Sequence, residues 1–231
     1  MEEYTKKIFP EPATLFDDHE GMPAAKVATM NIQGDMGWAA DSKLYPELMD
    51  EMGLNEEIGA DKRRYEMTVG RMDSLQKANF DKSYRVIAED FKKRYPTMTA
   101  KELTQWRYQR YMQDYLGTIK AVDENVGRVL DYLEANDLME NTIIVYTSDQ
   151  GFYLGEHGWF DKRFIYDQSF KTPLLVSWPN RIKAGSVSDE LVQNLDFAQT
   201  FLDAAGVKPP ADMQGLSMLP VLTGEVGNWK R

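Results

Sequence analysis

Apolar residues recur at steps of three and four positions between residues 99 and 133, which is the spacing of one face of an α-helix. The stripe consists of Met112, Leu116, Ile119, Val122, Val126, Val129 and Leu133. Thr99 stands three residues before Glu102, and this pair is typical of a capping box, in which each residue satisfies a backbone N–H group of the other. The pattern therefore predicts a long helix that begins near Thr99 and buries one face.

Short apolar runs of another kind follow this helix. Ile143–Thr147 and Leu174–Trp178 are dominated by β-branched, leucine and aromatic residues, which favour strands. A final helical pattern begins near Asn194 or Asp196, each a suitable N-cap, and ends at Gly206. The order helix, strand, loop, strand, helix predicts an α/β fold.

The upstream part of the chain has a less regular pattern. Prolines and glycines are frequent in residues 1–40, which favours loops and short extended pieces. A short helix is expected over Tyr45–Met52, closed by Gly53. The segment Asp61–Tyr95 is dense in charged residues and predicts surface helices, which end where Pro96 breaks the chain.

Composition indicates a globular chain with 42% hydrophobic and 28% charged residues. No apolar run reaches the roughly 18 to 20 residues that a membrane-spanning helix needs. The net charge of −10 argues against a nucleic-acid partner, because nucleic-acid binding requires a clustered basic face. With no cysteine, the chain forms no disulfide and no thiolate metal site of its own.

Polar residues of the types that bind ligands or take part in catalysis follow directly after the strand at Ile143–Thr147. Asp149 and Gln150 come first, followed by a Gly155-Glu156-His157-Gly158 loop and then by Lys162. In open α/β sheets ligands bind outside the carboxyl ends of strands, which is where Asp149 and Gln150 are expected. A carboxylate and an amide carbonyl suit a hard cation such as Ca²⁺ or Mg²⁺ better than zinc.

These motifs resemble those of the type I sulfatases of the alkaline phosphatase superfamily. The resemblance rests on Ser148-Asp149-Gln150-Gly151, on Gly155-Glu156-His157-Gly158, and on Lys162 followed by Tyr166-Asp167. It extends to the strand within 172–179 and to the segments 195–206 and 214–220. Similarity is strong from about Tyr115 to Gly224. The resemblance implies part of the sulfatase sheet-and-helix domain, incomplete in this chain.

The nucleophile of that family has no counterpart in the expected place. Type I sulfatases use a cysteine or serine in a Cys-x-Pro-x-Arg or Ser-x-Pro-x-Arg motif near their N-terminus, which is oxidised to formylglycine. One match to the serine form begins at Ser177, but it starts on an apolar strand downstream of His157 and Lys162, so we interpret Ser177 as structural. We therefore expect the chain to be the C-terminal part of a longer sulfatase domain. We expect loops and surface helices over 1–98, an α/β segment over 99–224, and the start of a linker at 225–231.

The resemblance also implies roles for single residues. Asp149 and Gln150 would bind Ca²⁺, with Mg²⁺ a weaker candidate, while His157 and Lys162 would be catalytic. Three further residues could line a sugar-binding mouth or simply pack, namely Tyr153, Trp159 and Arg163. His19, in an acidic stretch, matches no family spacing, and a solvated acidic loop explains it.

The implied reaction is hydrolysis of a sulfate ester on a sulfated carbohydrate, such as a glycosaminoglycan or mucin glycan. In it a hydrated formylglycine attacks sulfur, calcium polarises the sulfate, a histidine protonates the departing alcohol and Lys162 neutralises developing charge. The family implies a periplasmic or extracellular location, although Met1–Lys7 has no signal-peptide core. Two alternatives remain open: a phosphoester or phosphonate hydrolase of the same superfamily, and a non-catalytic glycan-binding module.

Overall fold

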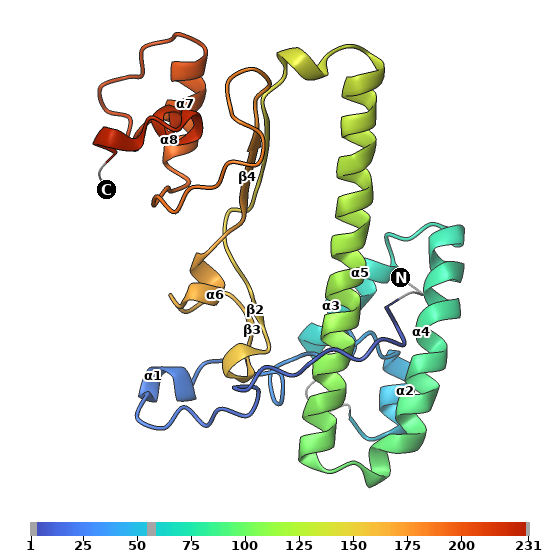
Figure 1. The fold of residues 1–231 in the computed structure, drawn as a ribbon. Coiled ribbons are helices and arrows are strands. Elements are labelled where there is room, and N and C mark those ends of the chain that lie inside the picture. Colours follow the sequence, from blue (N-terminus) through green and yellow to red (C-terminus); the bar gives the residue numbers. More distant parts are fainter. Residues whose placement is uncertain (1–3, 55–58, 230–231) are drawn as a thin grey trace. The chain divides into compact units, whose positions relative to one another are not determined.

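The computed structural model describes residues 4–54 and 59–229, which form two compact units (Figure 1). The first unit contains Met1–Glu124 and Phe152–Ser169, and the second contains Asn125–Gly151 and Phe170–Arg231. The boundary between the units does not coincide with the change of pattern near residue 98, because one long helix begins in the first unit and ends in the second.

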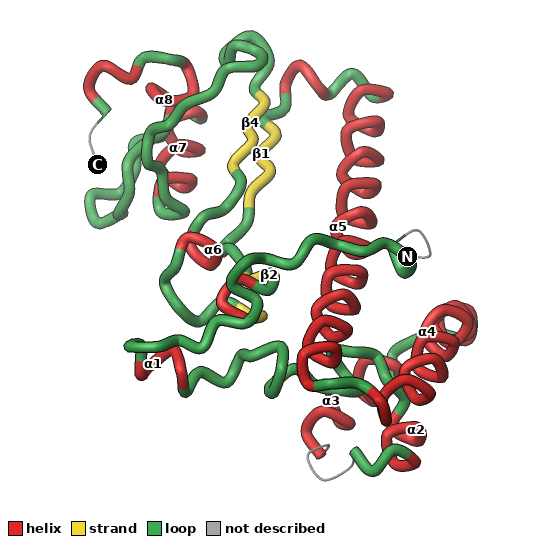
Figure 2. The backbone as a smooth tube through the Cα atoms, turned by 60° about the horizontal axis from the view of Figure 1, so that its bottom comes forward, coloured by secondary structure: helices red, strands yellow, loops and turns green. Residues whose placement is uncertain are grey.

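Helices predominate in the chain, and its strands are short (Figure 2). The α-helices are α1 (Pro23–Lys26), α2 (Pro46–Glu51), α3 (Gly59–Val69), α4 (Ser74–Arg94), α5 (Ala100–Ala135), α6 (Asp167–Phe170), α7 (Asp196–Ala204) and α8 (Leu219–Thr223). The strands are β1 (Ile144–Thr147), β2 (Tyr153–Leu154), β3 (Phe160–Asp161) and β4 (Leu174–Ser177). None of the described helices has the length and apolar character needed to cross a membrane.

The long helix α5 confirms the strongest prediction from the sequence. Its capping box is present: the N–H of Thr99 donates to Glu102 Oε2 at 2.8 Å, and the N–H of Glu102 donates to Thr99 Oγ1 at 3.2 Å. The prediction of one continuous buried face is correct only for the first half, where Met112 is buried. In the second half Ile119 and Val129 are 40% and 59% exposed, so the apolar stripe is not buried there.

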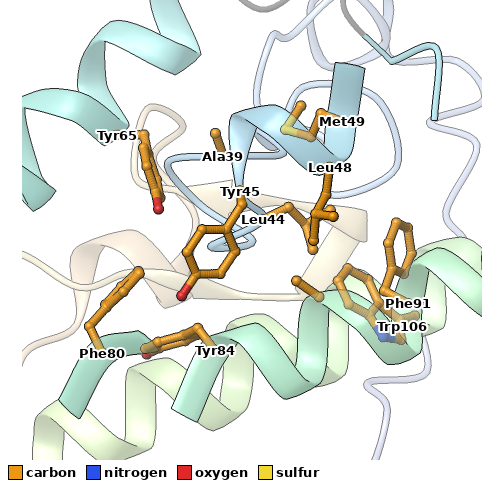
Figure 3. Close-up of a cluster of buried hydrophobic side chains, with 11 residues drawn as sticks. Ala39, Leu44, Tyr45, Leu48, Met49, Tyr65, Phe80, Tyr84, Phe91 and Trp106 are labelled. Carbon is orange, nitrogen blue, oxygen red and sulfur yellow. The ribbon is translucent and has the colours of Figure 1, made fainter. Parts of the chain in front are cut away.

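The largest hydrophobic core lies in the first unit and is mainly aromatic (Figure 3). Its buried members are Ala39, Leu44, Tyr45, Leu48, Met49, Tyr65, Phe80, Tyr84, Ala88, Phe91 and Trp106. The rings of Phe91 on α4 and Trp106 on α5 lie 4.0 Å apart. The helices predicted over 61–95 are therefore present, but α3 and α4 contribute to the core as well as to the surface, since their aromatic residues face α2 and α5.

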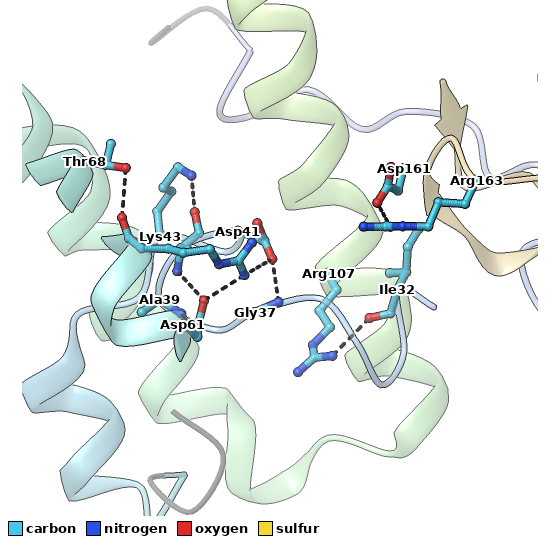
Figure 4. Close-up of polar contacts among 12 residues, drawn as sticks. Ile32, Gly37, Ala39, Asp41, Lys43, Asp61, Thr68, Arg107, Asp161 and Arg163 are labelled. Carbon is cyan, nitrogen blue, oxygen red and sulfur yellow. Dashed lines mark hydrogen bonds and ion pairs between the residues drawn. The ribbon is translucent and has the colours of Figure 1, made fainter. Parts of the chain in front are cut away.

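Two charged side chains attach the loop at residues 31–41 to the helices of the first unit (Figure 4). The carboxylate of Asp61 on α3 accepts hydrogen bonds from the N–H groups of Ala39 at 2.7 Å and Ala40 at 3.0 Å. Arg107 on α5 donates to the carbonyl oxygen of Ile32 at 3.0 Å. Both side chains are buried, so these bonds stabilise the fold by satisfying backbone groups that water does not reach.

In the second unit, β1 and β4 confirm the two predicted strands. They pair antiparallel, with Ile144 opposite Ser177. Val145 and Val176 line a small apolar gap together with residues of α7 and α8, so both helices cover one face of the strand pair. Leu175 is 65% exposed on the other face.

Helix α7 also forms where the sequence predicts, and it ends at Ala204, two residues before Gly206, which has a φ of 69°. The predicted cap is wrong, because Leu195 occupies the N-cap position and no side chain caps there. Asp196 is fully buried, and its carboxylate accepts the N–H groups of Gln193 and Leu216, each at 2.8 Å. After α8, Val226–Asn228 forms a 3₁₀ turn, and the linker function of 225–231 stays a prediction.

Candidate active site

The predicted site residues belong to both units, since those before Phe152 lie in the second unit and those from Phe152 to Ser169 lie in the first. Asp149 and Gln150 follow β1 in the second unit, where Asp149 is exposed and Gln150 is half-buried. The hydroxyl of Ser148 donates to the carbonyl oxygen of Gln150 at 2.8 Å. The Asn194 amide donates to the carbonyl oxygen of Asp149 at 2.9 Å. These bonds hold the backbone of the turn and leave the Asp149 carboxylate at the surface.

The oxygen atoms of this turn fit a hard cation. A carboxylate and an amide carbonyl are ligands that Ca²⁺ and Mg²⁺ prefer. Calcium takes about six to eight oxygens. Among residues 4–54 and 59–229, however, no three His, Cys, Asp or Glu side chains converge as a metal site would require. Asp149 and Gln150 therefore fit as two ligands of a site and not as a whole one.

The loop that carries His157 is a tight turn between β2 and β3, which pair antiparallel. Gly155, His157 and Gly158 all have positive φ values of 100°, 58° and 69°. The two glycines are required by space as well, since a Cβ at Gly155 would lie 2.6 Å from the ring of Tyr108. The turn therefore holds His157 in a strained but well-supported backbone conformation.

His157 is held by an upstream loop that lies about 140 positions away in the sequence. Its ring Nδ1 lies 3.0 Å from Asp17 Oδ2, and its backbone N–H donates to Thr14 Oγ1 at 2.9 Å. The hydrogen bond with His157 is the largest of the effects that hold the pKa of the Asp17 carboxyl below its usual 3.8, followed by the N–H of His19. Both the ring and the backbone of His157 are thus fixed.

Aromatic rings surround the imidazole of His157. The ring of Tyr166 stacks on it with centroids 5.1 Å apart and planes at 28°. The rings of Trp159 and Tyr153 approach it at 5.5 Å and 6.4 Å. Tyr166, part of the sulfatase-like Lys162–Tyr166 spacing, therefore packs against the histidine of the preceding motif.

Tyr153 and Trp159 are fully buried in the first unit. The hydroxyl of Tyr153 donates to the carbonyl oxygen of Phe164 at 2.9 Å, and the ring of Trp159 stacks on Phe164 at 4.9 Å. A side chain without exposed surface has no face to offer to a sugar. Of the two interpretations that the sequence allows, packing is the one that fits this arrangement.

Lys162 and Arg163 follow β3 and are exposed. Arg163 forms an ion pair with Asp161 (Figure 4). Lys162 makes no hydrogen bond or ion pair with the part of the chain that the structure describes. Its ammonium group is therefore available to an anionic ligand, as the predicted role requires.

An open cleft of about 560 Å³ in the first unit reaches Asp161. Tyr111, Tyr115 and Phe152 line it, and the rings of Tyr115 and Phe152 are stacked with centroids 6.2 Å apart. The sequence did not single out these residues, because two of them lie on α5 and are far from the motif in the chain. The three residues are half-buried, and aromatic rings beside a carboxylate are suited to contact with a sugar.

The sequence also missed the role of the acidic stretch around His19. The interpretation as a solvated loop is wrong for His19, whose exposed fraction is 5%. Its ring stacks on Trp159 with centroids 4.7 Å apart, and its backbone N–H donates to Asp17 Oδ1 at 3.0 Å. No spacing rule links residues 17–19 to 157–159, so only the folded chain brings them together.

Ser177, the start of the Ser-x-Pro-x-Arg match, lies at the end of β4 opposite Ile144. This position in a strand pair agrees with the interpretation of Ser177 as structural.

Comparisons with known proteins identify relatives of this chain. The family described as N-sulphoglucosamine sulphohydrolase, C-terminal, matches residues 155–231. An N-acetylglucosamine-6-O-sulfatase of Bacteroides thetaiotaomicron is 46% identical over 96% of this chain. The N-acetylglucosamine-6-sulfatase of Bos taurus is 41% identical over 46% of the chain. The chain spans 38% of the Bacteroides protein and 19% of the bovine one.

Solved structures agree. A protein in complex with its substrate D-glucosamine-2-N,6-O-disulfate superposes with a TM-score of 0.86 at 45% identity, covering 99% of this chain and 45% of that one. A phosphonate monoester hydrolase of Silicibacter pomeroyi gives a TM-score of 0.53 at 32% identity over 59% of this chain and 26% of that one. From the matching motifs, sequences and folds we conclude that the chain belongs to the sulfatase family, of alkaline-phosphatase-like fold, and represents a C-terminal part of it.

Proposed function

We propose that the chain is part of a sulfuric ester hydrolase that removes sulfate from a sulfated sugar, with 6-O-sulfated glucosamine as the substrate class. The observation that supports this most is the 46% identity over 96% of the chain to an N-acetylglucosamine-6-O-sulfatase. The likeness to a structure solved with a 6-O-sulfated glucosamine supports the same substrate class. By analogy with the family, the enzyme works in the periplasm or outside the cell.

In this proposal the turn after β1 binds the metal. Asp149 and Gln150 contribute two oxygen ligands to a Ca²⁺ ion, with Mg²⁺ a weaker candidate. A bound cation supplies positive charge beside the sulfate oxygens. The remaining ligands and the nucleophile, expected to be formylglycine, belong to residues that this chain does not contribute.

Lys162 and His157 provide the catalytic groups of the chain. The ammonium group of Lys162 stabilises negative charge on the ester as the bond to sulfur breaks. His157 gives a proton to the departing sugar oxygen. The exposed guanidinium of Arg163 pairs with sulfate or carboxylate oxygens of the substrate.

The net charge of −10 does not conflict with an anionic substrate. Salt screens charges that lie more than about 8 to 10 Å away, so nearby groups dominate the field at a binding site. Lys162 and Arg163 are exposed and adjacent in the sequence, so this turn carries two positive charges, of which that of Arg163 is paired with Asp161. The cleft lined by Tyr111, Tyr115 and Phe152 is our candidate for the sugar, since its rings offer stacking surfaces.

A second candidate function is hydrolysis of a phosphoester or phosphonate. The similarity to a phosphonate monoester hydrolase supports it. A non-catalytic glycan-binding module is the third. The upstream reading frame in the genomic DNA tests all three. A Cys-x-Pro-x-Arg or Ser-x-Pro-x-Arg motif there supports the sulfatase. A serine or threonine nucleophile without that motif supports the phosphoester hydrolase, and the lack of any nucleophile supports the binding module.

The isolated 231-residue chain is expected to bind calcium only weakly. Asp149 and Gln150 supply two ligands, whereas tight calcium sites use about six to eight oxygens. Isothermal titration with CaCl₂ should show no affinity in the submicromolar range, and an Asp149→Ala variant should titrate like the wild type. Submicromolar binding that is lost in the variant would contradict the division of the site that we propose.

A further inference from the structure

Asp17 is placed to control the ring of His157. One carboxylate oxygen, Oδ2, lies 3.0 Å from His157 Nδ1, while the other, Oδ1, accepts the N–H of His19 at 3.0 Å. Each oxygen therefore has a different partner, and the carboxylate cannot rotate without losing one of them. The side chain of Asp17 is 23% exposed, so water competes only partly for these bonds.

The charge of Asp17 decides which atom carries the proton between the two residues. The hydrogen bonds to Asp17 hold its pKa below the usual 3.8, so at neutral pH the carboxyl is ionised and only accepts hydrogen bonds. The proton in the contact must then sit on His157 Nδ1. Among residues 4–54 and 59–229 no hydrogen bond is made by the other ring nitrogen, Nε2.

The loop that carries Asp17 is itself anchored to the turn that carries His157. Thr14 Oγ1 accepts the N–H of His157, and the ring of His19 stacks on Trp159 at 4.7 Å. Gly158 passes so close to this loop that a Cβ there would lie 2.9 Å from the carbonyl oxygen of Leu15. Contacts on both sides of Asp17 thus fix it relative to His157.

We infer that Asp17 is a positioning residue for His157, which keeps the proton on Nδ1 and leaves Nε2 as the atom that exchanges a proton with the substrate. The catalytic part of this inference rests on the proposed function. As an oxygen of the nucleophile expected in the enzyme that contains this chain bonds to sulfur, the ester S–O bond breaks and its electron pair goes to the sugar oxygen, which takes the Nε2 proton of the His157 imidazolium. The ring that remains is the neutral Nδ1–H form, which is the form that Asp17 binds.

Nitrogen NMR of the 231-residue chain tests the proton position without any assay of activity. The chain has two histidines, so labelling with ¹⁵N-histidine gives four ring nitrogens, and a His157→Gln variant assigns them. At a pH where both rings are neutral, the wild type is expected to show a protonated Nδ1 and an unprotonated Nε2 at His157. A protonated Nε2 in the wild type would overturn the inference.

Two variants separate Asp17 from its neighbour. Asp17→Ala removes the acceptor, so His157 is expected to shift toward the Nε2–H form. Asp18→Asn is the matched control, since Asp18 is exposed and, among the residues that the structure describes, accepts a hydrogen bond only from the N–H of Glu20. It should leave the His157 spectrum unchanged. If both variants gave the spectrum of the wild type, Asp17 would have no control over the ring.

Kinetics of the enzyme that contains this chain test the consequence. On an alkyl sugar sulfate, Asp17→Ala is expected to lower kcat by about tenfold or more with little change in KM. In a His157→Ala background the same change should have almost no further effect, because Asp17 acts through His157. Equal losses in both backgrounds would overturn the positioning role. An inactive wild type would instead count against the proposed function and leave the NMR result standing.

Discussion

Replacing Lys162 by alanine, in the enzyme that contains this chain, is expected to lower kcat by about a hundredfold or more. The reason is that an exposed ammonium group aimed at a developing negative charge acts mainly in the transition state. The KM for a sugar sulfate should change much less than kcat. The measurement is steady-state turnover of a 6-O-sulfated glucosamine.

Matched variants show whether the effect belongs to this position. Lys162→Arg keeps the charge and is expected to recover part of the turnover. Lys26→Ala removes an exposed lysine at the end of α1 and should retain normal turnover. Near-normal turnover of Lys162→Ala on sugar sulfates would mean that the turn at 161–163 is structural and that the assigned role is wrong.

Replacing His157 by alanine is expected to slow turnover in a way that depends on the leaving group. General acid catalysis contributes typically a hundredfold to ten-thousandfold when the leaving group is a poor one. A sugar alkoxide needs the proton, whereas an aryl oxide leaves readily without it. We therefore expect a loss of about a hundredfold on an alkyl sugar sulfate and a much smaller loss on an aryl sulfate.

The ratio of the two rates is the measurement, and each substrate serves as the control for the other. A general loss of folded protein would lower both rates by the same factor. Equal losses on alkyl and aryl sulfates would therefore contradict proton donation by His157, even if the variant were slow.

Local sequence signals predicted much of the fold. The capping box at Thr99 and the three-and-four spacing after it located α5, because both act within a few residues. The two strands and the glycine that ends α7 were predicted for the same reason. The N-cap of α7 was not predicted correctly. The carboxylate of Asp196 does not cap the helix, because it accepts the N–H of Leu216, 20 positions away.

The candidate site was predictable only where its residues are close in sequence. Motif spacing predicted Asp149, Gln150, His157 and Lys162 as site residues, and their roles stay predictions. The contact of His157 with Asp17 crosses 140 positions, and no periodicity encodes it. In the same way, the sequence could not decide whether Trp159 binds sugar or packs. The ring of His19 stacks on Trp159 and helps to bury it, and His19 lies in the same distant loop as Asp17.

The central claim is that this chain supplies part of a sulfate ester site. The most direct test is to identify the anion that is released by the enzyme that contains the chain. Glucosamine 6-sulfate and glucosamine 6-phosphate are offered separately, with Ca²⁺ present, and the products are separated by ion chromatography. We predict release of sulfate from the first, slowed by about a hundredfold or more in Lys162→Ala, and far slower release of phosphate from the second. Rapid phosphate release with no sulfate release would contradict the account.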